Sequence, residues 1–345
     1  MTAAGSPDTV EASALVARPG GQFAVEPVLI PGPGRDNIVV QVAYSGVSIG
    51  TEFGALGGKI DWGGFPMVTG YMATGTVTMA GTAVTGFAPG DRVYVRHNDG
   101  MRSALSGEPV NCRDGLHCSV ASLNPHGDHG AGILPEGVGL DVGSLFTVLS
   151  VGLHGVDMAG VSMGDSVVVI GLGTIGLGVV AAAAARGARV VGVDLRERCC
   201  TVARRLGAWE TVRPDGADTA TLVRSITGQA GADIVFEATG HRSLIDVGIA
   251  LTRPQGTLVW QGHYGEGPVE FEFVRAHHKQ LRMLFPCDDG LTECRAALLR
   301  SVRDGRLPVE LLITDRLGPA EAAAFYGLVS RQGSGDSISP VISWL

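Results

Sequence analysis

Three closely spaced glycines and a later acid form the pattern in this sequence with the clearest chemistry. Gly171-Leu172-Gly173-Thr174-Ile175-Gly176 follows a short apolar run, and Asp194 ends the next one. The first glycine permits a tight turn, the second lets the backbone approach a pyrophosphate, and the third lets a helix lie close on a strand. The N–H groups at the start of that helix bind phosphate oxygens. A carboxylate at the Asp194 position bonds the ribose hydroxyls of NAD and repels the 2′-phosphate of NADP. The pattern predicts a dinucleotide site that prefers NAD.

A strand, a helix and a second strand must position these residues. Residues 166–170 and 189–193 are β-branched apolar runs, typical of buried parallel strands, and an Ala- and Val-rich helical stretch extends between them to about Ala185. This context favours the dinucleotide site over a structural glycine turn that binds nothing. Arg196 and Arg198 follow the acid and weaken the preference against NADP.

Beyond Asp194, strands and helices alternate. We expect helices at 196–206, 219–227, 243–251 and 292–304, and strands at 232–238, 256–261 and near 277–285. Such alternation predicts an α/β fold with a doubly wound parallel sheet. By contrast, residues 14–95 show short strands separated by Pro-Gly turns and predict an all-β region. A helix is expected at 141–159, and the mixed pattern of 311–345 is expected to return to the β-rich region.

Histidines and thiols gather in an irregular, glycine-rich segment between residues 97 and 133. It carries His97, Cys112, His117, Cys118, His126, Asp128 and His129. A histidine titrates near neutral pH and suits proton transfer. The alternative is a metal site built from these side chains, although their spacing matches no standard ligand pattern.

Composition excludes several function classes. The chain has 345 residues, enough for two domains, and 52 of them are glycine. A net charge of −8 argues against nucleic acid or a membrane surface as a partner. No secretory signal is visible, and the apolar segment around 179–185 is too short to span a bilayer, so a soluble cytoplasmic protein is expected. Six cysteines, with Cys199 and Cys200 adjacent, are typical of reduced thiols.

Several motifs occur in an order that resembles the medium-chain dehydrogenase/reductase superfamily, also described as zinc-type alcohol dehydrogenase-like. Phe87–Val93 reads FAPGDRV, Met163–Val167 reads MGDSV, and Ala232–Gly240 reads ADIVFEATG. The resemblance implies a GroES-like β-rich catalytic domain at 1–150 and 291–345. It also implies a Rossmann dinucleotide-binding domain at 151–290, and a homodimer.

The zinc ligands of that superfamily are replaced in this chain. Ser48 stands in place of the cysteine before the Gly-Thr-acid turn, Tyr71-Met72 in place of His-Glu, and Thr147 in place of a glutamate. A catalytic zinc needs about three N, S or O⁻ protein ligands, which these side chains do not supply. The lobe of four closely spaced cysteines that holds a structural zinc is also missing, so no zinc is expected. The Ser48–Glu52 turn resembles a zinc-lacking branch that includes the bacteriochlorophyllide dehydrogenases.

The resemblance also implies where the reaction occurs. Ser48, Thr51 and Tyr71 are expected near the vacated metal position, where they bind the substrate oxygen, with His97 or His129 passing on the proton. Other residues have lesser expected roles: Glu52 anchors the turn, His126 and His263 are further relay candidates, His154 packs in a helix, and His277 and His278 are structural. The implied cofactor-binding residues are Gly171, Gly173, Thr174, Ile175, Gly176, Asp194, Leu195, Arg196, Thr239, Gly240, Gln261, Gly262 and His263.

The sequence thus predicts a zinc-independent, NAD-dependent oxidoreductase. It would transfer a hydride between nicotinamide and a secondary alcohol or ketone of a small polar or biosynthetic substrate. One alternative is an NAD(P)H-dependent reductase of an activated C=C bond, and another is a non-catalytic NAD-binding sensor.

Overall fold

The computed structural model describes residues 8–214, 219–228 and 230–345. It divides into two compact units, Met1–Thr147 with Ile313–Leu345, and Val148–Leu312. The first corresponds to the β-rich domain expected at 1–150 and 291–345, and the second to the nucleotide domain expected at 151–290. Residues 291–312 differ from that expectation, because they pack within the second unit.

Two sheets build the first unit. One has the strand order β4-β1-β2-β7-β8, and the other the order β10-β6-β5-β3-β18-β17, with β9 also paired to β3. The β1–β2 hairpin is closed by Gly20 and Gly21, both with positive φ. The strands are β1 (Thr9–Arg18), β2 (Gln22–Pro31), β3 (Ile38–Gly46), β4 (Met67–Val68), β5 (Ala73–Ala80), β6 (Arg92–Val95), β7 (Met101–Ser103), β8 (Pro109–Val110), β9 (Val120–Leu123), β10 (Ala131–Ile133), β17 (Arg316–Leu317) and β18 (Val341–Ser343).

Helices interrupt this β-rich unit where the sequence predicted none. Helix α1 (Ile49–Leu56) begins at the turn that carries Ser48, and α10 (Pro319–Gln332) packs against β2 in the C-terminal return. Two glycines in α1 lower its helix propensity, so the sequence does not indicate a helix there. Helix α10 begins at Gly318, whose N–H donates to the Glu321 carboxylate at 2.7 Å. The helix expected at 141–159 is two helices, α2 (Leu140–Gly143) and α3 (Phe146–Ala159).

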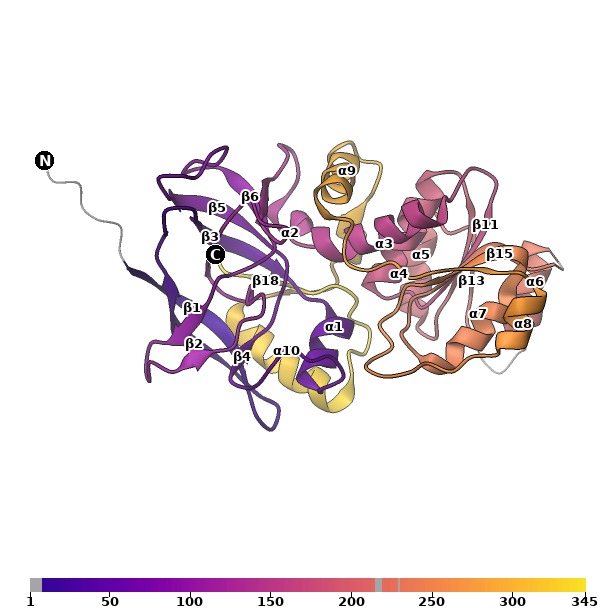
Figure 1. Ribbon diagram of the computed structural model, residues 1–345, viewed down its shortest axis with the longest axis horizontal. Helices are drawn as coiled ribbons and strands as arrows, with labels where there is room; N and C mark the ends of the chain where they lie inside the picture. Colours follow the sequence, from indigo (N-terminus) through magenta and orange to yellow (C-terminus); the bar gives the residue numbers. More distant parts are fainter. Residues whose placement is uncertain (1–7, 215–218, 229) are drawn as a thin grey trace, which may run out of the picture. The chain divides into compact units, whose positions relative to one another are not determined.

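The second unit is the predicted doubly wound sheet. Its six strands are all parallel, in the order β13-β12-β11-β14-β15-β16. The strands are β11 (Ser166–Ile170), β12 (Arg189–Val193), β13 (Glu210–Val212), β14 (Ala232–Glu237), β15 (Thr252–Trp260) and β16 (Arg282–Leu284). In Figure 1, α4 and α5 lie on one side of these strands and α7 and α8 on the other. This strand order is that of a dinucleotide-binding fold, with its ligand crevice at the carboxyl ends of the strands.

The helices of this unit follow the predicted alternation with few differences. They are α4 (Thr174–Ala185), α5 (Glu197–Arg205), α6 (Thr219–Thr227), the 3-10 turn η1 (Arg242–Leu244) with α7 (Ile245–Leu251), α8 (Phe273–His278), α9 (Leu291–Arg303) and the 3-10 turn η2 (Val309–Leu312). Helix α8 takes up His277 and His278, which were expected in a strand. Helix α4 buries every residue from Gly176 to Ala183, as expected for a helix that is apolar all round. In the described part of the chain, no helix is both long enough and apolar enough to cross a bilayer.

Candidate active site and dinucleotide-binding turn

The three glycines at the start of α4 are required for three different physical reasons. Gly171 has φ +89°, and a Cβ there would lie 2.5 Å from Thr239 Cγ2. A Cβ on Gly176 would lie 1.9 Å from the Gly171 carbonyl oxygen, so the helix could not approach the turn. Gly173 is different, because a Cβ there would meet nothing within 4 Å. This open space at the N-cap of α4 is what a pyrophosphate needs to reach the backbone N–H groups.

Asp194 joins the end of β12 to the glycine turn. Its Oδ2 accepts the Leu172 N–H at 2.8 Å, and its Oδ1 accepts the Arg196 N–H at 2.8 Å and Nε–H at 3.3 Å. The side chain is only 10% exposed, whereas Leu195 beside it is exposed. A carboxylate held in this way fits the adenosine ribose of NAD.

The remaining cofactor candidates lie at the carboxyl ends of the adjacent strands β14 and β15. A Cβ on Gly262 would lie 2.3 Å from Gly240 N, so the two strand ends touch through glycine backbone. Gln261 donates Nε2–H to the Val151 carbonyl at 3.2 Å, but its buried Oε1 has no partner in the described chain. His263 Nδ1 accepts the Gly265 N–H at 3.1 Å. The structure therefore places the predicted cofactor residues at the carboxyl ends of β11, β12, β14 and β15, where the open backbone at Gly173 fits a dinucleotide.

A buried glutamate organises this edge and was missed by sequence reasoning. Glu237, the last residue of β14, accepts the Thr239 N–H at 2.9 Å and the Tyr264 hydroxyl at 2.5 Å. Burial and the charge of Glu237 raise the pKa of Tyr264. Glu237 thus stabilises the Thr239-Gly240 turn that faces the crevice.

In the first unit, three predicted substrate-binding residues come together. Ser48 is the N-cap of α1, and the Tyr71 hydroxyl donates to Thr51 Oγ1 at 3.4 Å. Burial raises the pKa of Tyr71 to about 12, and hydrogen bonds from the Ser48 and Thr51 hydroxyls oppose that rise. The Arg96 guanidinium lies 5.1 Å from the Tyr71 ring centroid, and Trp62 packs against it edge-on. We call Ser48, Thr51 and Tyr71 the hydroxyl cluster.

The two predicted relay histidines form a second group around a carboxylate that sequence reasoning missed. Buried Asp114 Oδ1 lies 3.5 Å from His97 Nδ1 and 3.7 Å from His129 Nδ1, and Asp99 Oδ1 lies 3.5 Å from His97 Nε2. The hydrogen bond to Asp114 raises the pKa of His97. The Arg96 Nη1–H, one residue before His97, donates to the Tyr71 carbonyl at 3.2 Å and so links this group to the hydroxyl cluster.

A third cluster lies beneath the hydroxyl cluster. Glu52, His117 and Tyr326 are almost fully buried. His117 and Tyr326 both contact Glu52 Oε2, and the Tyr326 hydroxyl also lies 2.7 Å from His117 Nε2. The sequence groups His117 with the loop histidines and assigns Tyr326 to no site, because no spacing links positions so far apart. Burial opposes ionisation of Glu52, but the positive field and hydrogen bonds of its neighbours, His117 first, lower its pKa overall.

The positions of the expected zinc ligands carry no zinc-binding set. Ser48, Met72 and Thr147 are buried and offer hydroxyl or thioether groups, and Tyr71 is a neutral phenol at ordinary pH. Such donors do not fit a catalytic zinc. Over the ranges that the structure describes, no three His, Cys, Asp or Glu side chains gather as a metal site would require.

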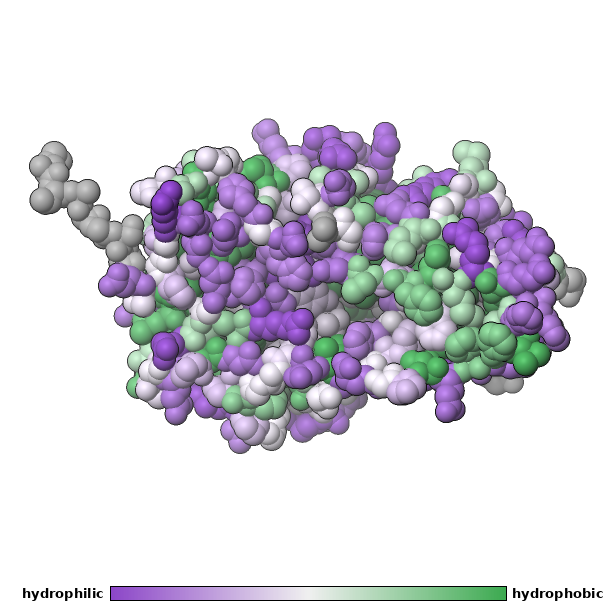
Figure 2. Space-filling view, viewed as in Figure 1, coloured by the Kyte–Doolittle hydropathy of each residue, from purple (hydrophilic) through white to green (hydrophobic). Residues whose placement is uncertain are grey.

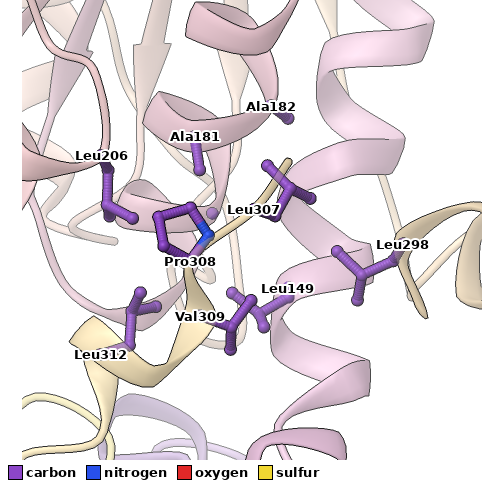
Figure 3. Close-up of a pocket in the computed structure, with 10 residues that line it drawn as sticks. Leu149, Ala181, Ala182, Leu206, Leu298, Leu307, Pro308, Val309 and Leu312 are labelled. Atoms are coloured by element: carbon purple, nitrogen blue, oxygen red, sulfur yellow. The ribbon is translucent and has the colours of Figure 1, made fainter. Parts of the chain in front are cut away.

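Figure 3 shows a small cavity in the second unit, of about 10 Å³, which is no substrate site. Ala181 and Ala182 of α4 face Leu307 and Pro308 across it, and its other walls are apolar. No polar side chain lines it to orient a substrate. We interpret it as incomplete packing beside α4.

Comparison with known proteins supports both units. Residues 34–154 match the family described as Alcohol dehydrogenase GroES-like domain, and residues 174–287 match Zinc-binding dehydrogenase. Human sorbitol dehydrogenase is 32% identical over 282 residues, which cover 76% of this chain and 77% of that protein. The NADP-dependent isopropanol dehydrogenase of Clostridium beijerinckii is 30% identical over 233 residues, 62% of this chain and 64% of that protein.

Solved structures share the fold. An alcohol dehydrogenase zinc-binding domain protein from Burkholderia ambifaria superimposes with a TM-score of 0.85 at 22% identity, over 97% of this chain and 99% of that one. The 2R,3R-butanediol dehydrogenase of Bacillus subtilis gives 0.81 at 21% identity, over 96% and 99%. With a GroES-like unit, a Rossmann unit and relatives of this similarity, the chain belongs to the zinc-type alcohol dehydrogenase-like superfamily of medium-chain dehydrogenases and reductases.

Proposed function

We propose that this chain is a zinc-independent, NAD-preferring oxidoreductase that interconverts a secondary alcohol and a ketone on a small polar or biosynthetic substrate. The observation that carries the proposal is the hydroxyl cluster, which stands where this superfamily places its metal ligands. The similarity to human sorbitol dehydrogenase and to other alcohol dehydrogenases supports an alcohol or polyol as substrate. Asp194, bonded into the glycine turn, supports NAD over NADP.

The chemistry divides between the cofactor and the chain. Bound NAD accepts or supplies the hydride, and the protein must bind the substrate oxygen and move its proton. With a pKa of about 12, Tyr71 keeps its proton at neutral pH and acts as a hydrogen-bond donor to the developing alkoxide. The alcohol proton passes to a histidine, for which His97 and His129 are the candidates.

Two further properties belong to this proposal. A homodimer formed through the nucleotide-binding units is supported by the edge strand β16, which is followed by exposed Phe285, and by exposed Phe273 and Val274 on α8. Figure 2 shows apolar residues gathered over the part of this unit that contains α7 and α8. The structure joins none of the six cysteines in a disulfide, which supports a reducing cytoplasmic location.

The test follows nicotinamide absorbance while the protein is mixed with a panel of secondary alcohols and polyols, with NAD and NADP in parallel. We expect NADH formation with at least one alcohol, unchanged after a chelator, and metal analysis that finds less than one tenth of an equivalent of zinc. One equivalent of zinc lost together with activity would disprove zinc independence. Reduction of enones without any alcohol oxidation would favour a C=C reductase, and tight NAD binding without turnover of either class would favour a sensor.

A further inference from the structure

One carboxylate contacts both segments that carry the hydroxyl cluster. Glu52 Oε1 accepts the backbone N–H of Ser48 at 2.8 Å, across the first turn of α1. Glu52 Oε2 accepts the Thr69 hydroxyl at 2.7 Å, two residues before Tyr71. The side chain of Glu52 therefore ties the α1 turn, with Ser48 and Thr51, to the strand end that leads into Tyr71.

The Glu52 carboxylate is in turn held by hydrogen-bond contacts with Tyr326 and His117. Tyr326 OH donates to Glu52 Oε2 at 2.6 Å, and His117 Nε2 lies 2.8 Å from the same oxygen. His117 also holds the Tyr71 segment, because its N–H donates to the Thr69 carbonyl at 3.0 Å, and a Cβ on Gly70 would lie 2.8 Å from its ring. The Gly70 backbone therefore packs directly against this ring.

A hydrogen-bond chain also connects the C-terminal segment to His117. Trp344 Nε1 can only donate, and it lies 3.0 Å from Ser45 Oγ, which is itself 2.8 Å from His117 Nδ1. Ser45 Oγ therefore accepts from the indole and contacts the imidazole ring, whose Nε2 lies against Glu52.

Two of these residues come from the C-terminal return of the chain. Tyr326 lies on α10, where its ring packs 5.0 Å from that of Phe53 on α1, and Trp344 follows β18. Helix α1 needs such support, because it has eight residues, and two of them, Gly50 and Gly54, weaken it. A buried ionised group is weak support for stability, since apolar side chains of similar size often serve as well. An apolar side chain could not accept the Ser48 N–H.

We infer that Glu52, His117 and Tyr326 form a positioning network through which the C-terminal helix α10 sets the geometry of the hydroxyl cluster. The inference rests on the proposed function, since it assigns these residues to the site that binds the substrate oxygen. None of the three contacts the substrate. They act by holding the Ser48 turn and the Tyr71 strand end at a fixed separation.

The experiment uses the full chain with Tyr326→Phe, Glu52→Gln and the control Tyr44→Phe, a half-buried tyrosine on β3. The first variant removes one donor and keeps the ring. Steady-state rates and the primary deuterium isotope effect are measured with the alcohol that the wild type oxidises fastest. We expect kcat to fall about 3- to 10-fold in Tyr326→Phe and about 100-fold in Glu52→Gln, with the Kd for NAD within twofold of wild type. The isotope effect rises in both variants because hydride transfer becomes rate-limiting, and Tyr44→Phe matches wild type.

A purely structural role gives a different result. Partial unfolding lowers kcat in proportion to the loss of NAD-binding sites and leaves the isotope effect unchanged, and this outcome overturns the inference. Amide exchange of residues 48–56 and 69–72 gives a readout without turnover. If the wild type oxidises no alcohol, the proposed function fails, while faster exchange in Tyr326→Phe still supports the network. Wild-type exchange in Tyr326→Phe overturns it, even if Glu52→Gln fails to fold.

Discussion

Substitution of Gly173 by alanine should weaken NAD binding without weakening the fold. Gly173 has φ −71° and ψ −174°, an extended conformation that alanine adopts freely, and the new Cβ would meet nothing within 4 Å. The free chain therefore gains no clash. The loss of glycine flexibility in the unfolded state contributes about 0.4–1 kcal/mol and offsets the N-cap preference for glycine, so the stability should change little. The same methyl group occupies the space through which a phosphate oxygen reaches the backbone.

The size of the effect follows from the hydrogen bond that is lost. A hydrogen bond to a charged group contributes about 1.5–3 kcal/mol. At about 1.4 kcal/mol per tenfold change, the Kd for NAD should rise about 10- to 150-fold. Isothermal titration with NAD gives the affinity, and thermal unfolding without cofactor gives the stability.

Two further glycines of α4 serve as controls for this prediction. Gly176→Ala would place its Cβ 1.9 Å from the Gly171 carbonyl oxygen, so it should lose stability as well as NAD affinity. Gly178→Ala places its Cβ 3.5 Å from Leu149, an ordinary contact, and should bind NAD as the wild type does. Wild-type NAD affinity in Gly173→Ala, or a fall in its melting temperature like that of Gly176→Ala, would refute the assigned role of the open space.

Four other predictions follow from the same structure. Gly178→Ala should raise stability by about 1 kcal/mol, because a buried helix position loses a glycine, and calorimetry checks this. The folded pKa of Glu52 is lowered below its ordinary value of 4.5, so its stabilising contribution is present above pH 4.5 and disappears as the pH falls through the folded pKa. Urea unfolding between pH 3 and 6 should therefore show a free energy of unfolding that depends less steeply on pH in Glu52→Gln than in the wild type. Asp194→Ser should raise kcat/KM with NADP relative to NAD by about tenfold or more, since the repelling carboxylate is gone, and an unchanged ratio would contradict the ribose assignment. The pKa of His97 is raised above 6.5, so the rate of alcohol oxidation should increase as the pH rises through that pKa. This increase with pH should be absent in His97→Asn. Full activity in both His97→Asn and His129→Asn would rule out the relay.

Local sequence patterns determined the first βαβ segment of the second unit. The apolar runs that became β11 and β12, the glycine turn between them and the acid that ends the second strand all lie within one βαβ segment. Period and turn chemistry act over a few residues, so they can be read directly from the chain. Helix α1 was missed because its two glycines oppose helix formation, and tertiary contacts of Glu52 with Thr69 and with Tyr326 of α10 overrode that local preference.

The candidate active site divides in the same way. The sequence by itself determined that Ser48, Tyr71 and Thr147 replace metal donors, because the identity of a side chain decides which atoms it can offer. Only the tertiary structure decided that Tyr326 would lie 2.6 Å from Glu52, across 274 residues of chain, and that Asp114 would lie between His97 and His129. No local pattern specifies such contacts, since they depend on how sheets and helices pack after the chain returns. The packed fold, more than any motif, therefore defines the geometry in which these side chains meet.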